Sequence, residues 1–437
     1  MRISVIGCGY LGAVHAACMA KLGHEVVGID VDPRKIENLS TSRAPFYEPG
    51  LEHLLEEVLQ TGRLRFTTDI SEAKGNSVHF ICVGTPQKKG ENAADLTYVD
   101  AVATGLLPFL SPGDLVVGKS TVPVGTASRL AHLINLEHPS AHLIWNPEFL
   151  REGHAVADTL RPDRFVYGVS DGSEDNPAVA VLDDVYAVPL QAGTPRLVTD
   201  HATAELVKAA ANSFLATKIS FINAMAEVCE ASGADVTGLA DAIGLDDRIG
   251  RKFLNAGIGF GGGCLPKDIR AFMARAGELG ADQALTFLRE VDAINMRRRS
   301  RVVELARNLC DDSLLGQQVT VLGAAFKPES DDVRDSPALS IAAQLQLHGA
   351  VVTVTDPKAL PNAARRFPEL QYEECTRKAL EGADMVLLLT EWQEYCDLDP
   401  YEIAGLVGAP RMLDGRNVFD PNKWRAAGWT YRGLGRP

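Results

Sequence analysis

One cysteine of this chain lies in a glycine-rich loop beside charged side chains. Residues Gly259 to Asp268 read Gly-Phe-Gly-Gly-Gly-Cys-Leu-Pro-Lys-Asp, with the cysteine at position 264. Glycine lets a backbone come close to a bound ligand, and a cation such as Lys267 favours the thiolate, the form of cysteine that attacks carbon. A tight turn with an incidental buried cysteine is the alternative. Taken alone, the loop around Cys264 is equally compatible with a nucleophile and with a turn.

A lysine and an asparagine lie one turn apart on a long predicted helix. Residues from about Asp200 to Ser232 are rich in Ala, Leu, Ile and Phe at helical spacing. Lys208 and Asn212 share one face of this helix. Their neighbours are small or apolar, which favours a polar pair that points into a cleft; a solvated Lys–Asn pair is the alternative. The helix is long enough to join two lobes, and its apolar excess predicts a dimer contact.

Further polar residues follow predicted strands. Thr121 lies in segment 119–126, after a strand at 115–117, while Glu148 and Glu152 lie in segment 146–153, after a strand at 142–145. In a doubly wound parallel sheet, ligands bind beyond the carboxyl ends of the strands. These three residues are therefore candidates for a site. A helix cap or a solvated side chain is the alternative for each.

The amino-terminal elements predict a dinucleotide site. An apolar strand at 3–6 precedes Gly7-Cys8-Gly9-Tyr10-Leu11-Gly12, and a helix and a second strand then lead to Asp30. In this pattern Gly7 permits the turn, Gly9 admits the pyrophosphate and Gly12 lets the helix pack on the strand. Asp30 is expected to bind the ribose hydroxyls and to repel a 2′-phosphate. This favours NAD over NADP, although the nearby Arg34 and Lys35 weaken the preference.

The carboxy-terminal third partly repeats this pattern. A strand at 319–322 followed by Gly323 resembles the strand at 3–6 followed by Gly7, but segment 324–337 has lost the glycines and contains Lys327 and Arg334. We predict a second Rossmann-like domain whose side-chain cations bind the phosphates of another nucleotide, with Arg416 as a further candidate. For Arg334, a surface ion pair with one of the neighbouring aspartates at 331, 332 and 335 is the alternative.

Composition narrows the class of protein. The chain has 437 residues, 46% hydrophobic and 23% charged, as expected of a soluble globular protein with two or three domains. A net charge of −14 argues against nucleic acid as a partner. The 8 cysteines include no Cys-x-x-Cys pair, which predicts free thiols in a reducing, cytoplasmic location and no metal site. No signal peptide is expected, and no apolar run is long enough to span a membrane.

In their order, these segments resemble the UDP-glucose/GDP-mannose dehydrogenase family over nearly the whole chain. The resemblance rests on segments 7–12, 119–126, 146–153, 253–257, 259–268 and 327–337, together with Lys208 and Asn212. Segment 253–257 and the stretch Asp414-Gly415-Arg416-Asn417 suit the UDP-glucose branch better than the GDP-mannose branch. The resemblance implies an α/β fold with two Rossmann-like, doubly wound parallel-sheet domains joined by a long central helix.

The resemblance also implies a domain plan and a reaction. We expect an NAD-binding domain at 1–198, a central helical domain at 199–300 and a UDP-sugar-binding domain at 310–437, in a homodimer. The expected reaction is a four-electron oxidation that converts the C6 alcohol of a UDP-sugar to the acid and reduces two NAD. The expected UDP-sugar is UDP-glucose. Cys264 forms a thiohemiacetal and then a thioester, which water hydrolyses.

Residue roles follow from the same resemblance. Lys208 and Asn212 stabilise oxyanions at C6, Glu148 activates water with Asp268 as partner base or orienting carboxylate, and Thr121 positions the water or the nicotinamide. NAD contacts are expected from Gly7, Gly9, Tyr10, Leu11, Gly12, Asp30, Lys35, Thr121, Glu152, Lys267 and Arg334. UDP-sugar contacts are expected from Glu148, Phe149, Leu150, Arg151, Glu152, Lys208, Asn212, Arg248, Phe253, Leu254, Asn255, Ala256, Gly257, Gly261, Lys327 and Arg416, with Arg248 acting on a neighbouring subunit.

Other functions stay open at this point. The same chemistry on GDP-mannose or on a UDP-N-acetylhexosamine is one alternative. A two-electron β-hydroxyacid-type dehydrogenase would use the helical lysine and asparagine but needs no cysteine and no second nucleotide domain. A non-catalytic NAD-sensing protein would keep residues 7–30 but has no need for Cys264. The number of NADH formed per sugar separates these possibilities.

Overall fold

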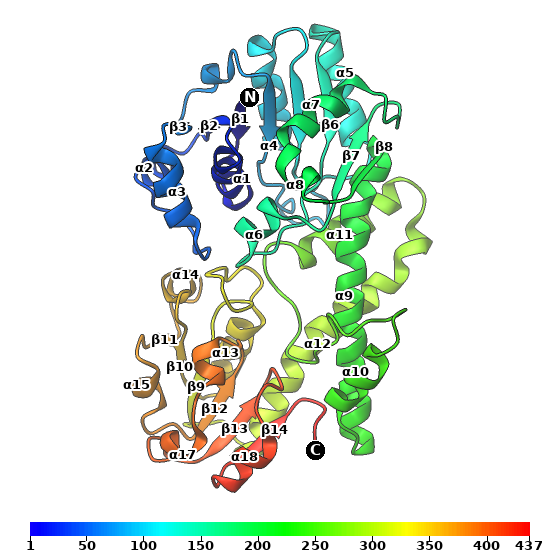
Figure 1. Ribbon diagram of the computed structural model, residues 1–437. Helices are drawn as coiled ribbons and strands as arrows, with labels where there is room; N and C mark the ends of the chain where they lie inside the picture. The colour runs from blue at the N-terminus through cyan, green and yellow to red at the C-terminus, as the bar shows by residue number, and fades with distance from the viewer. The chain divides into compact units, whose positions relative to one another are not determined.

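The computed structural model describes residues 1–437, which group into two compact units. Unit 1 comprises Met1–Ala211 and Arg270–Gly280, and unit 2 comprises Asn212–Ile269 and Ala281–Pro437. Each unit contains one open sheet with helices packed against it (Figure 1). The long helices α9 (His201–Ser232) and α11 (Leu265–Glu278) each contribute residues to both units.

The sheet of unit 1 has eight strands in the order β3-β2-β1-β4-β5-β6-β7-β8. The six strands from β3 to β6 are parallel, in the 3-2-1-4-5-6 order of a dinucleotide-binding fold. The predicted doubly wound parallel sheet is thereby confirmed for these six. β7 pairs antiparallel with β6, and β8 is parallel to β7, so the last two strands are reversed. The strands are β1 (Arg2–Ile6), β2 (Glu25–Ile29), β3 (Leu64–Thr67), β4 (Val78–Ile81), β5 (Leu115–Gly118), β6 (His142–Trp145), β7 (Phe165–Val169) and β8 (Arg196–Asp200).

Helices pack on both faces of this sheet because its central strands are apolar on both sides. Val5 and Phe80 face one hydrophobic core, which includes α1, whereas Ile6 and Ile81 face a second core, which includes α4 and α5. The helices of unit 1 before α9 are α1 (Tyr10–Lys21), α2 (Pro33–Ser40), α3 (Leu51–Gln60), α4 (Thr97–Leu106), α5 (Thr126–Glu137), α6 (Ala155–Leu160), α7 (Pro177–Val185) and α8 (Ala187–Gln191).

The sheet of unit 2 has six parallel strands in the order β11-β10-β9-β12-β13-β14. Numbered from β9, this is the 3-2-1-4-5-6 order of unit 1, so the predicted second Rossmann-like domain is confirmed. The two sheets also share one hydrogen bond after their second strands. Asp356 accepts the N–H of Ala324 at 2.7 Å, as Asp30 accepts the N–H of Cys8 at 2.8 Å. The strands are β9 (Gln318–Leu322), β10 (Val351–Thr355), β11 (Gln371–Tyr372), β12 (Met385–Leu388), β13 (Arg411–Asp414) and β14 (Thr430–Gly433).

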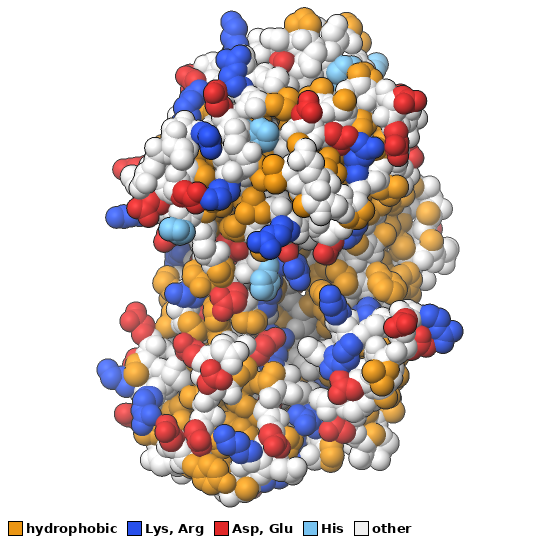
Figure 2. Space-filling model, in the orientation of Figure 1, with side chains coloured by type: hydrophobic (Ala, Val, Ile, Leu, Met, Phe, Trp, Pro, Cys, Tyr) orange, Lys and Arg blue, Asp and Glu red, His pale blue; other side chains and the backbone are white.

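The remaining helices belong to unit 2, and none in the chain is both long and apolar enough to cross a membrane. Charged side chains of both signs are interspersed with apolar ones over the visible face (Figure 2). These helices are α10 (Val236–Gly244), α12 (Thr286–Leu309), α13 (Pro337–Leu347), α14 (Leu360–Arg366), α15 (Thr376–Leu380), α16 (Gln393–Cys396), α17 (Pro400–Ile403) and α18 (Pro421–Ala426).

Candidate active site

The glycine turn between β1 and α1 has three glycines with three separate tasks. Gly7 has φ +92, in the left-handed region that favours glycine. A Cβ on Gly12 would lie 1.8 Å from the carbonyl oxygen of Gly7, so only glycine lets α1 pack this closely. A Cβ on Gly9 would meet no atom within 4 Å. The turn is therefore open at Gly9, the position at which a pyrophosphate needs room.

Asp30 follows β2 and faces the glycine turn. Its Oδ2 accepts the N–H of Cys8 at 2.8 Å and Lys35 Nζ at 2.7 Å, while Oδ1 accepts the N–H of Asp32 at 3.0 Å. Each carboxylate oxygen can accept more than one hydrogen bond, so Oδ1 has capacity for a ribose hydroxyl. The structure thus brings together the predicted residues Asp30, Lys35 and the glycine turn.

A glutamate that the sequence analysis missed ties the glycine turn to the loop after β6. Glu48 is buried and accepts a hydrogen bond from the Tyr10 hydroxyl. The same carboxylate accepts the N–H of Gly153 at 2.6 Å and that of Ala155 at 2.7 Å. Burial, and then Glu48, raise the pKa of Tyr10. Glu48 has no helical or strand periodicity around it, so the sequence offers no signal for its role.

Glu148 and Lys208 form an ion pair inside unit 1. Lys208 Nζ lies 2.9 Å from Glu148 Oε1, and Glu148 Oε2 accepts the N–H of Leu150 at 2.9 Å. Lys208 is 5% exposed, which excludes the solvated alternative for this side chain. Thr121 is half-buried after β5, and its carbonyl accepts the hydroxyl of Thr85 at 2.7 Å. The pair joins a residue of α9 to the loop after β6.

The other predicted residues of segment 146–153 differ in exposure. Phe149, Leu150 and Glu152 are half-buried. Arg151 is exposed and donates to Asp158 three times, at 2.9, 2.9 and 2.6 Å. Leu11 of the glycine turn is half-buried. Arg151 thus already has a carboxylate partner in α6.

In unit 2, Asn212 and Asp268 form the corresponding buried contact. Asn212 Nδ2 donates to Asp268 Oδ2 at 2.7 Å, and Lys267 Nζ donates to Asp268 Oδ1 at 2.5 Å. Asn212 and Asp268 are 7% and 4% exposed. Both members of the predicted helical pair, Lys208 and Asn212, therefore bond to a carboxylate that was itself predicted for the site.

Cys264 is exposed and immediately precedes α11. Its carbonyl accepts the N–H of Asp268 at 3.0 Å, so the cysteine is the N-terminal cap residue of a 14-residue helix. The free N–H groups and the dipole at a helix start favour a negative charge there. This position favours the thiolate form of a cysteine.

The glycines before Cys264 make room for another part of the chain. A Cβ would lie 2.4 Å from the Asp335 carbonyl oxygen at Gly261, 2.8 Å from the Phe326 ring at Gly262 and 2.2 Å from the Arg334 guanidinium carbon at Gly263. The N–H of Gly262 also donates to the Arg334 carbonyl at 2.8 Å. We expected these glycines to admit a ligand; in the structure they admit the segment from 326 to 335.

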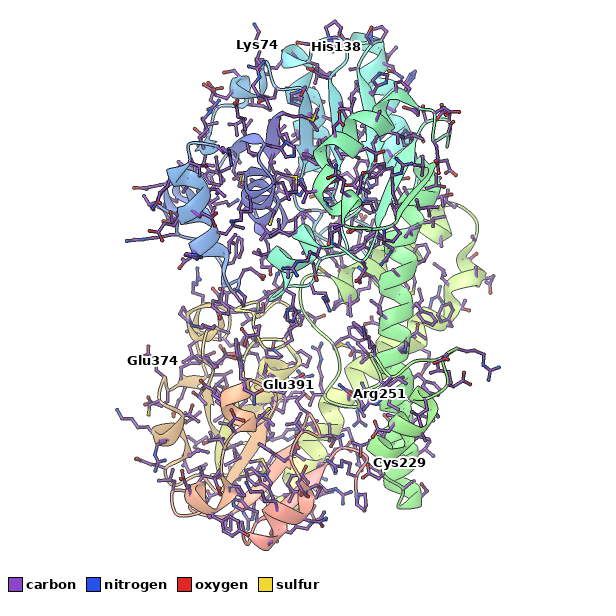
Figure 3. All side chains as sticks on the ribbon, in the orientation of Figure 1. Lys74, His138, Cys229, Arg251, Glu374 and Glu391 are labelled. Atoms are coloured by element: carbon purple, nitrogen blue, oxygen red, sulfur yellow. The ribbon has the colours of Figure 1, made fainter.

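The cations of the second Rossmann-like fold have protein partners. Arg334 donates to Asp332 at 2.7–2.9 Å and is 59% exposed, which is the surface ion pair named as the alternative. Lys327 is half-buried, with Nζ 5.7 Å from the centre of the Phe326 ring. Arg416 donates to the carbonyls of Leu389 and Phe326 and pairs with Glu391, which is labelled in Figure 3.

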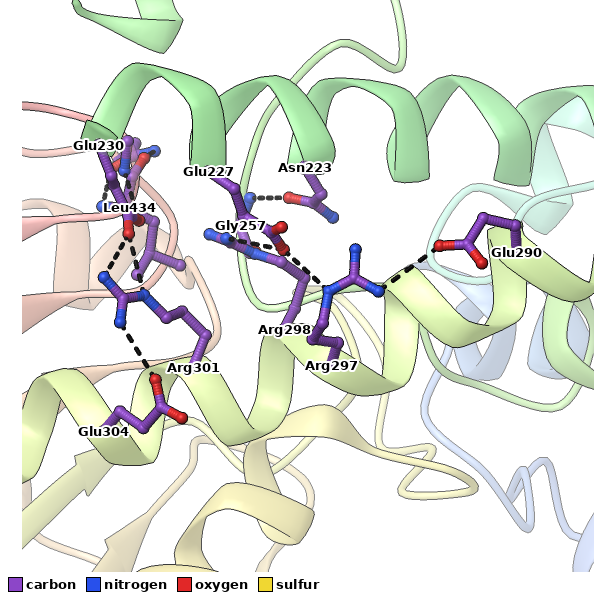
Figure 4. A network of polar contacts seen from close by, with 12 residues as sticks. Asn223, Glu227, Glu230, Gly257, Glu290, Arg297, Arg298, Arg301, Glu304 and Leu434 are labelled. Atoms are coloured by element: carbon purple, nitrogen blue, oxygen red, sulfur yellow. Dashed lines mark hydrogen bonds and ion pairs between the residues drawn. The ribbon is translucent and has the colours of Figure 1, made fainter. Parts of the chain in front are cut away.

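Segment 253–257 is anchored between α9 and α12. The N–H of Gly257 donates to Asn223 Oδ1 at 2.8 Å, and its carbonyl accepts Arg298 Nε at 3.2 Å (Figure 4). Leu254 and Ala256 are buried, whereas Phe253 is 40% exposed. Asn255 accepts a bond from Arg251 at 2.7 Å. Arg248 bonds to Asp246 at 2.7 Å with its side chain 88% exposed.

Three family models match consecutive parts of the chain. They describe the NAD binding domain, the central domain and the UDP binding domain of one family, and they match residues 1–189, 202–297 and 320–421. The chain belongs to the UDP-glucose/GDP-mannose dehydrogenase family. The resemblance given by the sequence motifs is confirmed.

Individual members of this family are similar over the full chain. A UDP-glucose 6-dehydrogenase of Rhizobium meliloti (strain 1021) is 41% identical over 440 residues, which cover 100% of both chains. The structure of a UDP-glucose dehydrogenase from Pyrobaculum islandicum superposes with a TM-score of 0.89 at 39% identity, covering 100% of this chain and 98% of that one. A UDP-D-ManNAc dehydrogenase from Pyrococcus horikoshii has a TM-score of 0.86 at 27% identity, covering 100% and 99%.

The family identifies this protein as an NAD-dependent dehydrogenase, and the residues present fit NAD. Gly9 leaves room for the pyrophosphate, Asp30 Oδ1 can accept a ribose hydroxyl, and Lys35 lies beside that carboxylate. The backbone N–H groups at the start of α1 are available to phosphate oxygens.

Proposed function

We propose that this protein oxidises the C6 alcohol of UDP-glucose to the carboxylate of UDP-glucuronate by way of a thioester on Cys264. The observation that supports this most directly is the position of Cys264: an exposed thiol that caps the N-terminus of α11. A two-electron dehydrogenase has no use for a nucleophile at such a position. Oxidation to an acid does need one.

The first oxidation converts the alcohol to an aldehyde. Two-electron oxidation at C6 would be supplied by bound NAD as hydride acceptor. In the first oxidation, we propose that the alcohol oxygen gives up its proton to the carboxylate of Asp268, and negative charge develops on the oxygen. We assign Lys208 and Asn212 to stabilise that charge, since both carry N–H donors and both are buried, where such donors act most strongly.

The second oxidation needs a tetrahedral carbon, which an aldehyde lacks. The Cys264 thiolate adds to the aldehyde carbon, forming an S–C bond and a thiohemiacetal oxyanion. Oxidation of this adduct leaves a thioester. Because the intermediate stays covalently bound, the reactive aldehyde is not released. We propose that Asp268, held by Asn212 and Lys267, orients these groups or acts as a base.

Water then hydrolyses the thioester. The attacking water forms a C–O bond and gives a proton to Glu148, the S–C bond breaks, and Cys264 leaves as the thiolate. Glu148 is suited to this because Lys208 and the N–H of Leu150 fix one carboxylate oxygen each. We propose that Thr121 positions the water or the nicotinamide. The remaining NAD and UDP-sugar contacts named from the sequence stay proposals of the same kind.

UDP-glucose is the proposed substrate because the chain shares about 40% identity with enzymes of that name, against 27% with the UDP-D-ManNAc enzyme. The stretch at 414–417 and segment 253–257 favour the same branch. We also propose the division into domains at 1–198, 199–300 and 310–437, with the central domain as the dimer contact, and a cytoplasmic location.

The dimer contact is proposed to be one face of α9. Phe214, Phe221 and Val228 recur every seven residues and are 67%, 48% and 56% exposed. Seven residues are nearly two helical turns, so these side chains form an apolar stripe. A second copy of the chain would bury this stripe against its own.

Counting NADH per sugar tests the proposed reaction. The purified protein is incubated with limiting UDP-glucose, GDP-mannose or UDP-N-acetylglucosamine and excess NAD. The proposal predicts about two NADH per UDP-glucose and little turnover of the others. A yield of one would indicate the two-electron alternative, and no turnover with any sugar would favour an NAD-sensing protein.

A further inference from the structure

Lys119, directly after β5, is buried with neutral hydrogen-bond partners. Its Nζ donates to Asn146 Oδ1 at 3.0 Å and to the Tyr186 hydroxyl at 3.3 Å, and Tyr186 itself donates to Asn146 Oδ1 at 2.9 Å. Asn146 Nδ2 donates to the carbonyl of Val166 at 2.9 Å. Asn146 stands two residues before Glu148, so this network fixes the start of the loop that bears Glu148.

The carboxylate whose charge acts on Lys119 is that of Glu148. A buried ammonium is costly unless a negative charge compensates it. Glu148 already pairs with Lys208 at 2.9 Å, so two lysines share one carboxylate. The arrangement therefore places an excess of positive charge around the group proposed to accept the proton of the hydrolytic water.

A cavity of about 50 Å³ joins Lys119 to Glu148. Its wall also includes His15 and Tyr186, and the Nε2 atom of His15 is buried without a hydrogen-bond partner. A cavity of this volume with several polar groups can hold water. Lys119 and Glu148 thus face a common polar space below the loop.

Several other titratable or charged side chains surround Lys119. They are His15 of α1, Cys82 after β4, Tyr186 between α7 and α8, Lys208 of α9, and Asp158, Asp163 and Arg164 of the cavity wall. Burial, and then Lys119, lower the pKa of His15, and burial raises that of Cys82 to about 12. Asp158 is bound by Arg151, and Arg164 stacks on the Phe149 ring at 3.9 Å. None of these groups supplies Lys119 with a direct ion pair.

We infer that Lys119 is a positioning residue for Glu148, which fixes the Asn146–Glu148 turn and adds a second positive charge to that of Lys208. Without the bond from Lys119 to Asn146, the turn that carries Glu148 loses one of its fixed points, so hydrolysis of the thioester should slow more than its formation. The inference rests on the proposed function, and it concerns the hydrolysis step alone.

The test compares three variants that separate the charge from the hydrogen bonds. Lys119→Met removes both, Lys119→Arg keeps the charge and can use the adjacent cavity for its larger side chain, and Tyr186→Phe removes a hydrogen bond but leaves the charge. Each variant is mixed with UDP-glucose and NAD and quenched in acid. Formation and decay of the enzyme-bound acyl group are both followed at one neutral pH.

Lys119→Met is expected to slow decay of the acyl group about tenfold while its formation changes by less than about threefold. Lys119→Arg, which can still donate to Asn146, should keep the rate of decay within about threefold of wild type, as should Tyr186→Phe, which leaves the bond from Lys119 to Asn146 in place. Equal slowing of formation and decay in Lys119→Met would reduce Lys119 to a structural role and overturn the inference. Unchanged decay in Lys119→Met would do the same. If wild type forms no acyl-enzyme from UDP-glucose, the proposed function itself fails.

Discussion

Replacing Lys119 by methionine should change the stability of the protein with opposite sign at neutral and alkaline pH. The substitution removes a buried ammonium and keeps most of the aliphatic side chain. Burial lowers the pKa of Lys119 from 10.5 to about 8, with Lys208 acting in the same direction and Cys82 and Glu148 opposing it. Lys119 therefore destabilises the folded state at every pH at which its side chain is protonated.

The magnitude follows from the linkage between protonation and folding. Lowering the pKa of Lys119 from 10.5 to about 8 corresponds to about 3 kcal/mol of lost folding free energy, at about 1.36 kcal/mol per pKa unit. The folded pKa lies below the unfolded one, so the unfolded state binds more protons between pH 8 and pH 10.5, and wild-type stability rises with pH across that window. Near pH 7 the protonated lysine destabilises the folded state by this full amount. Near pH 9.5 the folded protein has lost the proton, and the destabilisation is smaller by about 2 kcal/mol.

Lys119→Met also loses the hydrogen bonds to Asn146 and Tyr186, at about 1 kcal/mol each. The variant should therefore be more stable than wild type by about 1 kcal/mol near pH 7 and less stable by about 1 kcal/mol near pH 9.5. Urea unfolding of both proteins at the two pH values measures this difference. An equal difference at both pH values would show that Lys119 does not titrate in the folded protein, and would refute the reasoning.

Three further substitutions test other contacts. Glu48→Gln places an amide N–H where the carboxylate accepts four hydrogen bonds. We therefore expect it to cost about 1–3 kcal/mol of stability and to raise KM for NAD about tenfold, and unchanged NAD affinity would separate Glu48 from the cofactor site. Phe221→Asp should convert the proposed dimer to a monomer in light scattering. Phe287→Asp, at a similarly exposed phenylalanine of α12, should leave that dimer intact, and equal effects of the two substitutions would point to general destabilisation. Arg334→Ala should change the free energy of unfolding by less than about 1 kcal/mol, because its ion pair with Asp332 is exposed, while raising KM for NAD. An unchanged KM would contradict the assignment of Arg334 to the NAD site.

The sequence predicted most of the fold because the fold has strong local signals. Short apolar runs identified β1, β2, β5 and β6 in the first sheet, and the same pattern identified β9 in the second sheet. The reversal of β7 and β8 was not predicted, because buried strands of either direction are equally apolar. Strand direction depends on the path of the connection from 146 to 164, and no pattern in that connection indicates whether the next strand reverses.

The site was predictable where a residue follows a motif, and not where it acts through space. Cys264, Lys208, Asn212 and Asp268 could be selected by position, and the structure adds that each of the helical residues bonds to a carboxylate. Glu48 could not be selected, since its bonds reach residues 38 and 105 positions away along the chain. The glycines before Cys264 were correctly linked to close approach, but the approaching group is the chain's own segment 326–335.

Trapping the thioester tests the central claim most directly. Glu148→Gln is incubated with UDP-glucose and NAD, quenched in acid and digested, and the peptide that contains Cys264 is weighed by mass spectrometry. We predict a UDP-glucuronoyl adduct on this peptide, bound to sulfur through C6 as a thioester. None is expected in the double variant with Cys264→Ser, which should still bind NAD and UDP-glucose but form no acid. Acid formation with two NADH per sugar by Cys264→Ser, without an adduct in any variant, would contradict the assignment of Cys264 as the nucleophile.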